Sequence, residues 1–576
     1  MPRELCIGVA FAFSLFTACG SAPAVIPAGE APAPAGLRVE VWAPEPAELL
    51  ASVASALEGT SLAQRIPTDV PSVLSAMLEG SDAVVRLAAP DSPLGLVIVG
   101  SRERTAWIVR LRTLTDPDRA RLQLAPSGVP WARVVTVRDR SSRAVAAIAN
   151  DWLVVADDRG TLDATLPYLA RTLARRRARA ASPSLFFRFT DGAAADALRP
   201  ALDRRWRAWV RDAREAARNE RARHRLPPTI GEPEVLIDEV DRAIGRRLSW
   251  LRDLGRGEGS LRIEDGAVLV EATADVRGPS SPLARTLGGE PSAGAAAQGI
   301  GALPATTAFG WSGSAGAAAR RETTEDWLAA AARTSGSRLA EGELDRWRAA
   351  LRAFDDAVGD DRAVALGVDA NGRRTVAIAF ETRDEAAATT ACSGLAGVLA
   401  AGHLAEASSA LAGCVPLPTP ETTRAPGSGP SIARPAGDGG RIVCAPDPTR
   451  RDAHAGALGW SLRGRLGGLA WAHDVEAAIA LAASARESWS TPSGASIAGD
   501  DPDASRWLDA QRDAFFALAV SPSGIVRIAR ARAGSPPRDR ALVAFARTPR
   551  GIRTRARIPI RAALATVAIA RMLGSE

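Results

Sequence analysis

The side chains that most often carry catalysis are few in this sequence and are not spaced for it. The chain has four histidines, His224, His403, His454 and His473. No two of them stand three or four residues apart, the spacing at which a helix presents two imidazoles to one zinc ion. We therefore expect each histidine to be structural or solvated rather than catalytic.

Lysine chemistry is excluded, because all 72 basic residues are arginine. The chain can form neither a lysine-dependent P-loop, nor a Schiff base, nor the Ser-x-x-Lys pair of acyl-transfer enzymes. Serine and the carboxylates are therefore the remaining candidates for catalysis.

Serine and carboxylate chemistry also lack a recognisable motif. The stretch 310–314, GWSGS, comes nearest to the nucleophile elbow Gly-x-Ser-x-Gly, but a serine replaces its final glycine. Acidic pairs stand at Asp157-Asp158, Asp355-Asp356, Asp360-Asp361 and Asp500-Asp501. They lack the spacing of a calcium loop, and acids at helix starts usually cap the helix. The sequence thus predicts no catalytic, cofactor-binding or metal-binding residue.

One cysteine does suggest chemistry, namely lipid attachment at Cys19. An apolar run at Leu5–Phe16 is as long as the core of a signal peptide and too short to span a bilayer. The small residue Ala18 directly before Cys19 resembles the lipobox of bacterial lipoproteins. The resemblance implies that the chain is cut before Cys19 and that the cysteine is acylated. The alternative is a plain secretory signal cut between Ala18 and Ala24.

Lipidation of Cys19 would hold the protein in the cell envelope. Each buried methylene contributes about 0.8 kcal/mol, so two or three acyl chains form an essentially permanent anchor. Gly20 stands where an aspartate would resemble an inner-membrane retention signal. The resemblance therefore implies an outer-membrane lipoprotein that faces the periplasm or the cell surface, whereas a plain signal implies a soluble periplasmic or secreted protein. Residues 20–36 are rich in alanine and proline and predict a tether.

Three further cysteines follow the leader, at Cys392, Cys414 and Cys444. In an oxidising compartment, one disulfide and one remaining thiol are the natural outcome. A Cys414–Cys444 bond would close the base of the Pro-, Gly- and Ser-rich loop 415–441, while a Cys392–Cys414 bond would join the ends of a helical segment. We slightly favour the first pairing, and the sequence leaves both open.

Arginine clusters give the chain its net charge of +7. Residues 192–225 predict a helix with one apolar stripe that includes Trp206 and Trp209, and its other faces carry many arginines. Arg204, Arg205, Arg207 and Arg211 are candidates for contact with an anionic envelope surface such as lipid or lipopolysaccharide phosphates. Interleaved acids favour a solvated helix instead. Export excludes nucleic acid as a partner, and the sequence does not identify a protein partner.

The remainder predicts an α+β fold in two similar halves, each with antiparallel hairpins or a sheet packed against amphipathic helices. The unit 146–173 predicts strand, Asn150-Asp151 turn, strand and helix, and 458–484 repeats it in weaker form. The expected divisions are a signal peptide at 1–18, the lipidated cysteine and tether at 19–36, and α+β domains at 37–292 and 300–576.

Several local elements are also expected. Strands at 94–100 and 105–112 predict one hairpin, and Asn371-Gly372 predicts another with a two-residue turn that needs positive φ at both positions. The stretch 558–573 predicts a closing amphipathic helix that packs on a sheet.

The leading functional hypothesis is an exported envelope lipoprotein that acts as a non-enzymatic binding or scaffold module. The alternatives are an envelope hydrolase with an unrecognised site and a protein that contacts anionic lipid or lipopolysaccharide.

We expect the mature protein to begin at an acylated Cys19, because the leader ends in a lipobox-like sequence. Intact-mass spectrometry of protein extracted from membranes should show the added lipid. The variant Cys19→Ser should lose that mass and leave the membrane fraction, whereas Cys392→Ser should retain both properties. Recovery of the uncleaved chain from the cytosol would contradict the export hypothesis.

Overall fold

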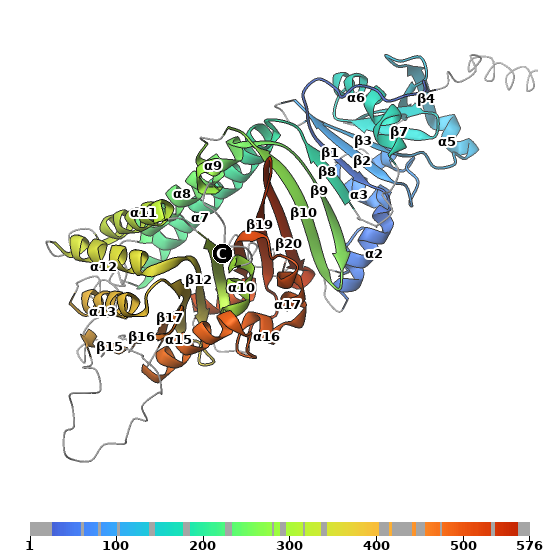
Figure 1. The fold of residues 1–576 in the computed structure, drawn as a ribbon. Coiled ribbons are helices and arrows are strands. Elements are labelled where there is room, and N and C mark those ends of the chain that lie inside the picture. The colour runs from blue at the N-terminus through green and yellow to red at the C-terminus, as the bar shows by residue number, and fades with distance from the viewer. Residues whose placement is uncertain are drawn as a thin grey trace, which may run out of the picture. The chain divides into compact units, whose positions relative to one another are not determined.

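The computed structural model describes residues 26–58, 63–78, 82–100, 104–137, 144–176, 185–224, 233–278, 281–287, 295–314, 317–335, 342–401, 414–416, 441–444, 456–472, 475–530 and 536–562. They belong to two compact units. The first comprises Met1–Ala197 with Arg256–Ile263, and the second comprises Leu198–Gly255 with Glu264–Glu576. Each unit contains antiparallel sheet and packed helices, which confirms the α+β class (Figure 1).

The expected domain boundary between 292 and 300 is wrong. The compact units divide near residue 197 instead, and the segment after it belongs largely to the second unit. The reason lies in strand pairing, since Ala267–Val276 pairs along nearly its whole length with Gly551–Pro559. Sequence order cannot reveal a pairing between strands so far apart.

The sheet of the first unit is antiparallel throughout and has the strand order β9, β8, β1, β2, β3, β7, β6, β5, β4. The strands are β1 (Leu37–Ala43), β2 (Leu94–Val99), β3 (Arg104–Arg110), β4 (Leu122–Pro126), β5 (Arg133–Val137), β6 (Val145–Ala149), β7 (Trp152–Ala156), β8 (Leu185–Phe189) and β9 (Leu254–Glu264). The hairpin predicted at 94–112 is therefore confirmed.

Helices pack on both faces of this sheet. They are α2 (Pro46–Ala56), α3 (Val70–Met77), α4 (Asp82–Val85), α5 (Asp116–Arg121) and α6 (Arg159–Arg171). Leu162, Leu166 and Leu169 of α6 join one buried cluster with strand residues, while α3 and α4 join a second cluster that includes Trp107 and Val155. The alternation of strand side chains accounts for the two clusters.

Part of the expected tether is packed rather than free. Ile26 is buried in the cluster under α6. The Ala31 N–H donates to the Thr172 hydroxyl at 2.9 Å, and that hydroxyl donates to the Ala31 carbonyl at 3.0 Å. The expectation of an unpacked tether is therefore wrong for residues 26–36, because two backbone groups and one isoleucine find partners there.

The two predicted tight turns have different outcomes. Asn150 adopts a φ of 54° between β6 and β7, and α6 follows, as the sequence predicts. The second hairpin also forms, but Val368 pairs with Arg374, which leaves residues 369–373 in the loop. Only Gly372 of the predicted pair has positive φ, at 81°. The two-residue turn expected there is wrong, because the Asp369 carboxylate accepts N–H groups from Asn371 and Arg373 and stabilises a longer loop.

The sheet of the second unit is also antiparallel, with the order β10, β20, β19, β18, β11, β12, β13, β17, β16, β15, β14. The strands are β10 (Ala267–Val276), β11 (Thr307–Ser314), β12 (Val358–Val368), β13 (Arg374–Thr382), β14 (Cys414–Pro416), β15 (Arg441–Cys444), β16 (Gly456–Arg463), β17 (Leu466–Ala472), β18 (Ala514–Val520), β19 (Ala541–Thr548) and β20 (Gly551–Pro559).

The helices of this unit form two groups. The helices are α7 (Arg199–His224), α8 (Pro233–Ser249), α9 (Pro282–Leu287), α10 (Ala295–Ala302), α11 (Ala317–Ser335), α12 (Glu343–Ala357), α13 (Glu385–Ala401), α15 (Val475–Ser490), α16 (Ile497–Asp500), α17 (Pro502–Asp509) and α18 (Pro522–Arg530). Helices α7, α8, α11, α12 and α13 lie side by side, and α10 and α15 lie against the sheet (Figure 1). Within the described residues, no helix is both long and apolar enough to cross a bilayer.

The sheet face under α10 and α15 is built almost entirely from small residues. We call it the helix face, and it includes Gly310, Ser312, Ala363, Ala365, Ala377, Ala379, Gly468, Ala470, Ala517, Ala519 and Ala544. A Cβ on Gly468 would lie 1.9 Å from the Ala482 carbonyl oxygen of α15. A Cβ on Gly310 would lie 2.5 Å from a methyl group of Leu303. Small residues are therefore required for the helices to approach the strands this closely.

We expect Gly468→Ala to destabilise the second unit by about 1–3 kcal/mol, because the added methyl must displace α15. The matched variant Gly394→Ala lies on α13 with nothing within 4 Å of its new Cβ. It should be neutral or stabilising by about 0.5–1 kcal/mol. Urea unfolding followed by circular dichroism distinguishes them. Equal unfolding midpoints for the two variants would refute the close packing.

Candidate functional site

The serine stretch 310–314 lies in the extended strand β11 and does not form an elbow. Ser312 is 1% exposed and lies under α10, where a Cβ on Gly299 would come within 2.2 Å of its hydroxyl. A nucleophile needs a strained turn that exposes its oxygen, and this serine has neither feature. The side chains of the four histidines fall outside the described residues.

The acidic pairs divide into caps and ion pairs. Asp158 accepts the Thr161 N–H and caps α6, and Asp501 accepts the Asp503 and Ala504 N–H groups and caps α17, as expected. The pairs at 355–356 and 360–361 were also expected to be caps, and this is wrong. They lie at the end of α12 and within β12, where Asp355, Asp356 and Asp360 pair with arginines. Among the residues that the structure describes, no group of three or more potential metal ligands comes together.

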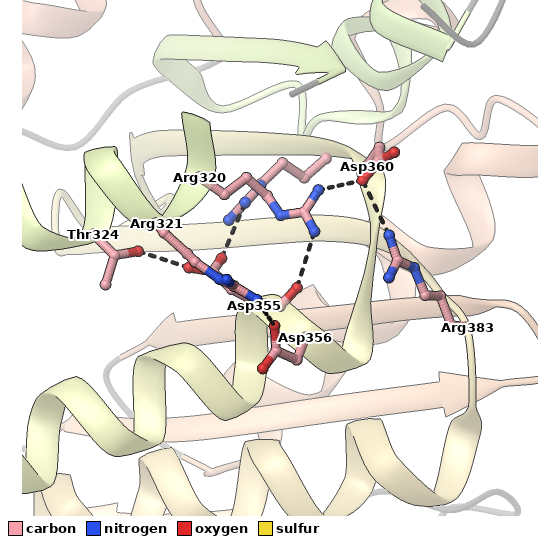
Figure 2. A network of polar contacts seen from close by, with 8 residues as sticks. Arg320, Arg321, Thr324, Asp355, Asp356, Asp360 and Arg383 are labelled. Carbon is pink, nitrogen blue, oxygen red and sulfur yellow. Dashed lines mark hydrogen bonds and ion pairs between the residues drawn. The ribbon is translucent and has the colours of Figure 1, made fainter. Parts of the chain in front are cut away.

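Asp355, Asp356 and Asp360 belong to a polar network between α11, α12 and the sheet (Figure 2). The Asp355 carboxylate is 5% exposed, accepts the Thr324 hydroxyl at 2.7 Å and pairs with Arg362 at 3.0 Å. Arg320 is also buried and donates to the Asp355 carbonyl at 3.2 Å, and it pairs with Asp360 as well. Burial lowers the pKa of Arg362, and Asp355 opposes that change. Each charge has a close partner, so the network is a structural tie.

A second buried polar group lies in the first unit. Tyr168, the single tyrosine of the chain, donates its hydroxyl to Glu40 of β1. Arg176 pairs with the other carboxylate oxygen of Glu40 at 2.6 Å. Burial, reinforced by the hydrogen bond to Glu40, raises the pKa of Tyr168. A phenol that holds its proton so strongly is suited to bracing α6 against β1.

The predicted arginine-rich helix forms as α7, but its apolar stripe is only partly buried. Val210 is buried and the Trp206 indole N–H donates to Asp241 of α8 at 2.7 Å. Trp209 is 40% exposed and stacks on Trp206 with ring centroids 4.6 Å apart. The helix predicted at 192–225 is therefore confirmed, and its stripe is partly exposed. The candidates Arg204, Arg205, Arg207 and Arg211 are all exposed.

The cysteines lie in two settings. Cys392 on α13 is a buried free thiol, and burial raises its pKa to about 12. The backbone register places Cys414 of β14 directly opposite Cys444 of β15. Opposed residues of antiparallel strands have Cα atoms about 4.5–5.5 Å apart, which falls within the range of a disulfide.

The face of the second unit's sheet opposite the helix face carries large apolar side chains. Antiparallel sheets that are covered on one side usually present polar residues on the other. Here Phe309 and Leu366, which are cross-strand partners on β11 and β12, are 36% and 43% exposed. Their neighbours on this side are half-buried. We call this surface the open face, and its residues are Phe309, Trp311, Val364, Leu366, Val376, Leu518, Val520 and Val543.

Among the described residues, two buried clusters cover the two ends of this side of the sheet. Phe354 of α12 packs against Phe380 of β13 with ring centroids 5.2 Å apart, within a cluster that includes α13. At the other end, Leu283 of α9 packs with Phe545 and Ile552. Helix α18 packs against β11 and β12 and exposes Ile525 at 42%. The open face lies between these two covered ends.

Sequence reasoning missed the open face, although a signal for it was present. The strands β13, β18 and β19 read TVAIAFE, FALAV and LVAFA, in which large apolar residues alternate with alanine. Such strands are apolar on both sides. In these strands the side chains alternate in size rather than in polarity. The side with alanine packs closely against helices, and the side with large residues forms a broad apolar surface.

Comparisons with known proteins give no family for this chain. No family model matches it, and no curated protein matches it. Crystal form III of TP0453 is similar over 44% of this chain and 82% of its own, at 8% identity and a TM-score of 0.21. Crystal form IV is similar over 42% and 77%, at 8% identity and a TM-score of 0.20. These scores are too low to support an inference about fold or function.

We expect Asp355→Asn to destabilise the second unit by about 3–5 kcal/mol, because it leaves Arg362, whose side chain is 16% exposed, without its nearest charged partner. The matched variant is Asp356→Asn, whose carboxylate is 61% exposed and lies 3.4 Å from Arg321. It should change the unfolding free energy by about 1 kcal/mol or less. Urea unfolding measures both, and a small effect at Asp355 would show that the network contributes little.

Proposed function

We propose that this protein is a non-enzymatic lipoprotein of the bacterial cell envelope that binds acyl chains on the open face. The lipobox-like sequence at Cys19 supports the location. The single observation that carries the binding role is the open face itself. A folded domain rarely exposes paired large apolar side chains such as Phe309 and Leu366 within a wider apolar face unless that surface binds something.

Acyl chains match the chemistry of the open face. Its residues are aliphatic or aromatic, and none of them carries a charge. A protein anchored at a membrane meets lipid chains at high local concentration. Burying one methylene contributes about 0.8 kcal/mol, so eight methylenes laid along the strands would supply about 6 kcal/mol before the cost of ordering the chain.

A second candidate role is contact with an anionic envelope surface through α7. The exposed Trp209 and Leu202 stand among the exposed Arg205, Arg207 and Arg211. Tryptophan and arginine together suit a boundary between apolar and charged layers. Asp203 pairs with Arg207 at 3.1 Å and weakens this case, so we rank it second.

The two units are, in this proposal, copies of one α+β module. The order β8, β1, β2, β3, β7, β6, β5, β4 has the same pattern as β18, β11, β12, β13, β17, β16, β15, β14. Strands β1 and β11 occupy the same place in the two orders. Both have a register shift after their first residue, at Leu37/Val39 and at Thr307/Phe309. Asn150 lies in the turn before β7 and α6, and Gly464 lies in the turn before β17 and α15. Both residues adopt positive φ. Duplication accounts for these shared details.

A disulfide between Cys414 and Cys444 is also part of the proposal. It is supported by the opposed positions of the two cysteines on β14 and β15. It is also supported by the burial of Cys392, which keeps that thiol from thiol–disulfide exchange with the pair. Closing about 30 residues would contribute roughly 3–4 kcal/mol in the chain-entropy model.

We expect the mature chain without its lipid, residues 20–576, to bind the fluorescent fatty acid cis-parinaric acid. Leu366→Glu should weaken binding about tenfold or more, because a carboxylate beside an acyl chain loses hydration. The control Leu124→Glu changes a leucine of β4 that is 51% exposed in the first unit, and it should bind normally. Equal affinities for both variants would exclude the open face, and no binding to the unsubstituted chain would exclude the acyl-chain proposal.

A further inference from the structure

Helices α7 and α8 of the second unit pack side by side as an antiparallel pair (Figure 1). The Trp206 indole N–H donates to Asp241 at 2.7 Å, and Arg214 pairs with Asp238 at 2.6 Å. Residue numbers rise along one helix as they fall along the other, so the two helices run in opposite directions. These contacts also fix which side of each helix faces the other.

Large apolar residues form a stripe on each helix, and the two stripes lie on the same side of the pair. At about 100° per residue, each stripe spans roughly 60°. In both helices the stripe is rotated in the same sense, by roughly 70–100°, from the side that contacts the partner helix. In an antiparallel pair, rotation in the same sense places both stripes on one side. We call this surface the tryptophan face, and its residues are Leu202, Trp206 and Trp209 of α7 and Ile237, Val240 and Ile244 of α8.

The tryptophan face is exposed to solvent. Eight large apolar side chains are exposed in the described part of the chain, and three of them belong to this face. Leu202, Trp209 and Val240 are 39%, 40% and 38% exposed. Trp209 also stacks on Trp206, with ring centroids 4.6 Å apart, and the two rings form one aromatic patch.

Helix α11 packs against α8 on the side opposite the tryptophan face. Arg333 of α11 donates to Glu239 at 2.6 Å, and Arg246 donates to Asp326 of α11 at 2.8 Å. Glu239 and Arg246 fall roughly 145° from the apolar stripe of α8. The packing of α11 therefore leaves the tryptophan face free for another contact.

The helix pair occupies a place where the second module has a much shorter connection. In the proposed duplication, β8 and β9 correspond to β18 and β19. Residues 190–253 connect the first two strands, whereas residues 521–540 connect the second two and contain the short helix α18. Under that duplication, α7 and α8 are an addition to one copy of the module, which favours a role of their own.

The composition of α7 favours a lipid bilayer as the partner of this face. Its 26 residues include nine arginines and four acidic residues. A helix with tryptophan and leucine on one side and arginine on the others is typical of helices that lie in a membrane interface. Arg207 and Arg211 fall on other sides of α7, where they would stay among the headgroups and meet lipid phosphates.

The area of the tryptophan face argues against a second copy of the chain as the partner. Each stripe spans eight residues, Leu202–Trp209 and Ile237–Ile244. Eight helical residues extend roughly 12 Å, and two neighbouring helices are about 20 Å wide, so the face covers roughly 250 Å². Each partner of a stable complex buries about 800 Å². A bilayer contact needs less area, because the proposed anchor at Cys19 would already hold the chain beside the membrane.

We propose that the tryptophan face inserts into the interface of a phospholipid bilayer and holds the second unit against the membrane. This inference goes beyond acyl-chain binding by the open face, and it rests on the proposed function for the anchor that keeps the protein at the membrane. It also differs from contact through the arginines of α7, because burial of apolar side chains from two helices supplies the attraction.

Vesicle flotation of the chain 20–576 tests this contact in the absence of the lipid anchor. Vesicles of phosphatidylethanolamine mixed with phosphatidylglycerol, at millimolar lipid concentration, should carry the unsubstituted chain upward in the gradient. Val240→Glu should lower the partition constant about tenfold, because a carboxylate in the interface loses hydration. The control Met77→Glu, at a residue of α3 that is 63% exposed, should bind normally. Circular dichroism checks that both variants are folded.

Several outcomes would overturn the inference. They are absence of flotation by the unsubstituted chain, and normal flotation of Val240→Glu. Loss of flotation in Arg207→Gln but not in Val240→Glu would assign the contact to the arginines instead. A dimer in sedimentation velocity that Val240→Glu dissociates would replace the membrane by a second copy of the chain.

The proposed function fails or holds separately. Loss of flotation in Leu366→Glu but not in Val240→Glu would move the membrane contact to the open face, which overturns the inference and leaves acyl-chain binding intact. Absence of cis-parinaric acid binding would exclude the acyl-chain proposal, while flotation that depends on Val240 would still support the tryptophan face.

Discussion

The close approach of α10 and α15 to the sheet of the second unit is the constraint on which the rest of this unit depends. Gly310, Gly459 and Gly468 leave no room for a side chain between strand and helix, and alanine occupies most neighbouring positions. Small residues gain little from burial individually, so this layer depends on backbone proximity and dense packing rather than on large side chains.

That arrangement moves the large apolar residues to the other side of the sheet. Because strand side chains alternate, each alanine on the helix face places a valine, leucine or phenylalanine on the opposite face. Helices α12 and α13 cover one end of that side, and the Asp355 network ties α12 to β12. Among the described residues, the open face is the part of that side where Phe309 and Leu366 are exposed. It is a consequence of how the core is packed.

The buried polar networks of the two units tie helices to strands. The buried charges of Glu40, Arg320 and Asp355 have partners within their own unit and brace helices against strands. Under the proposed function, the open face binds without orientation-specific contacts, which suits chains of methylenes better than polar solutes. The proposed lipid anchor at Cys19 and the proposed acyl-chain site on the open face would together give the protein a role at the membrane.

Local patterns by themselves determined much of this chain. The hairpins at 94–112 and around Asn150, the helix α7 and the caps at Asp158 and Asp501 all follow from neighbouring residues, because turn, cap and periodicity signals act over a few positions. The leader and its cysteine stay a prediction from the same kind of local signal. Only the tertiary structure decided the pairing of β10 with β20, the packing of Ile26, the burial of Asp355 among arginines and the exposure of Phe309 and Leu366. These features join residues far apart in sequence, and a valine that faces a helix is indistinguishable in sequence from one that faces water.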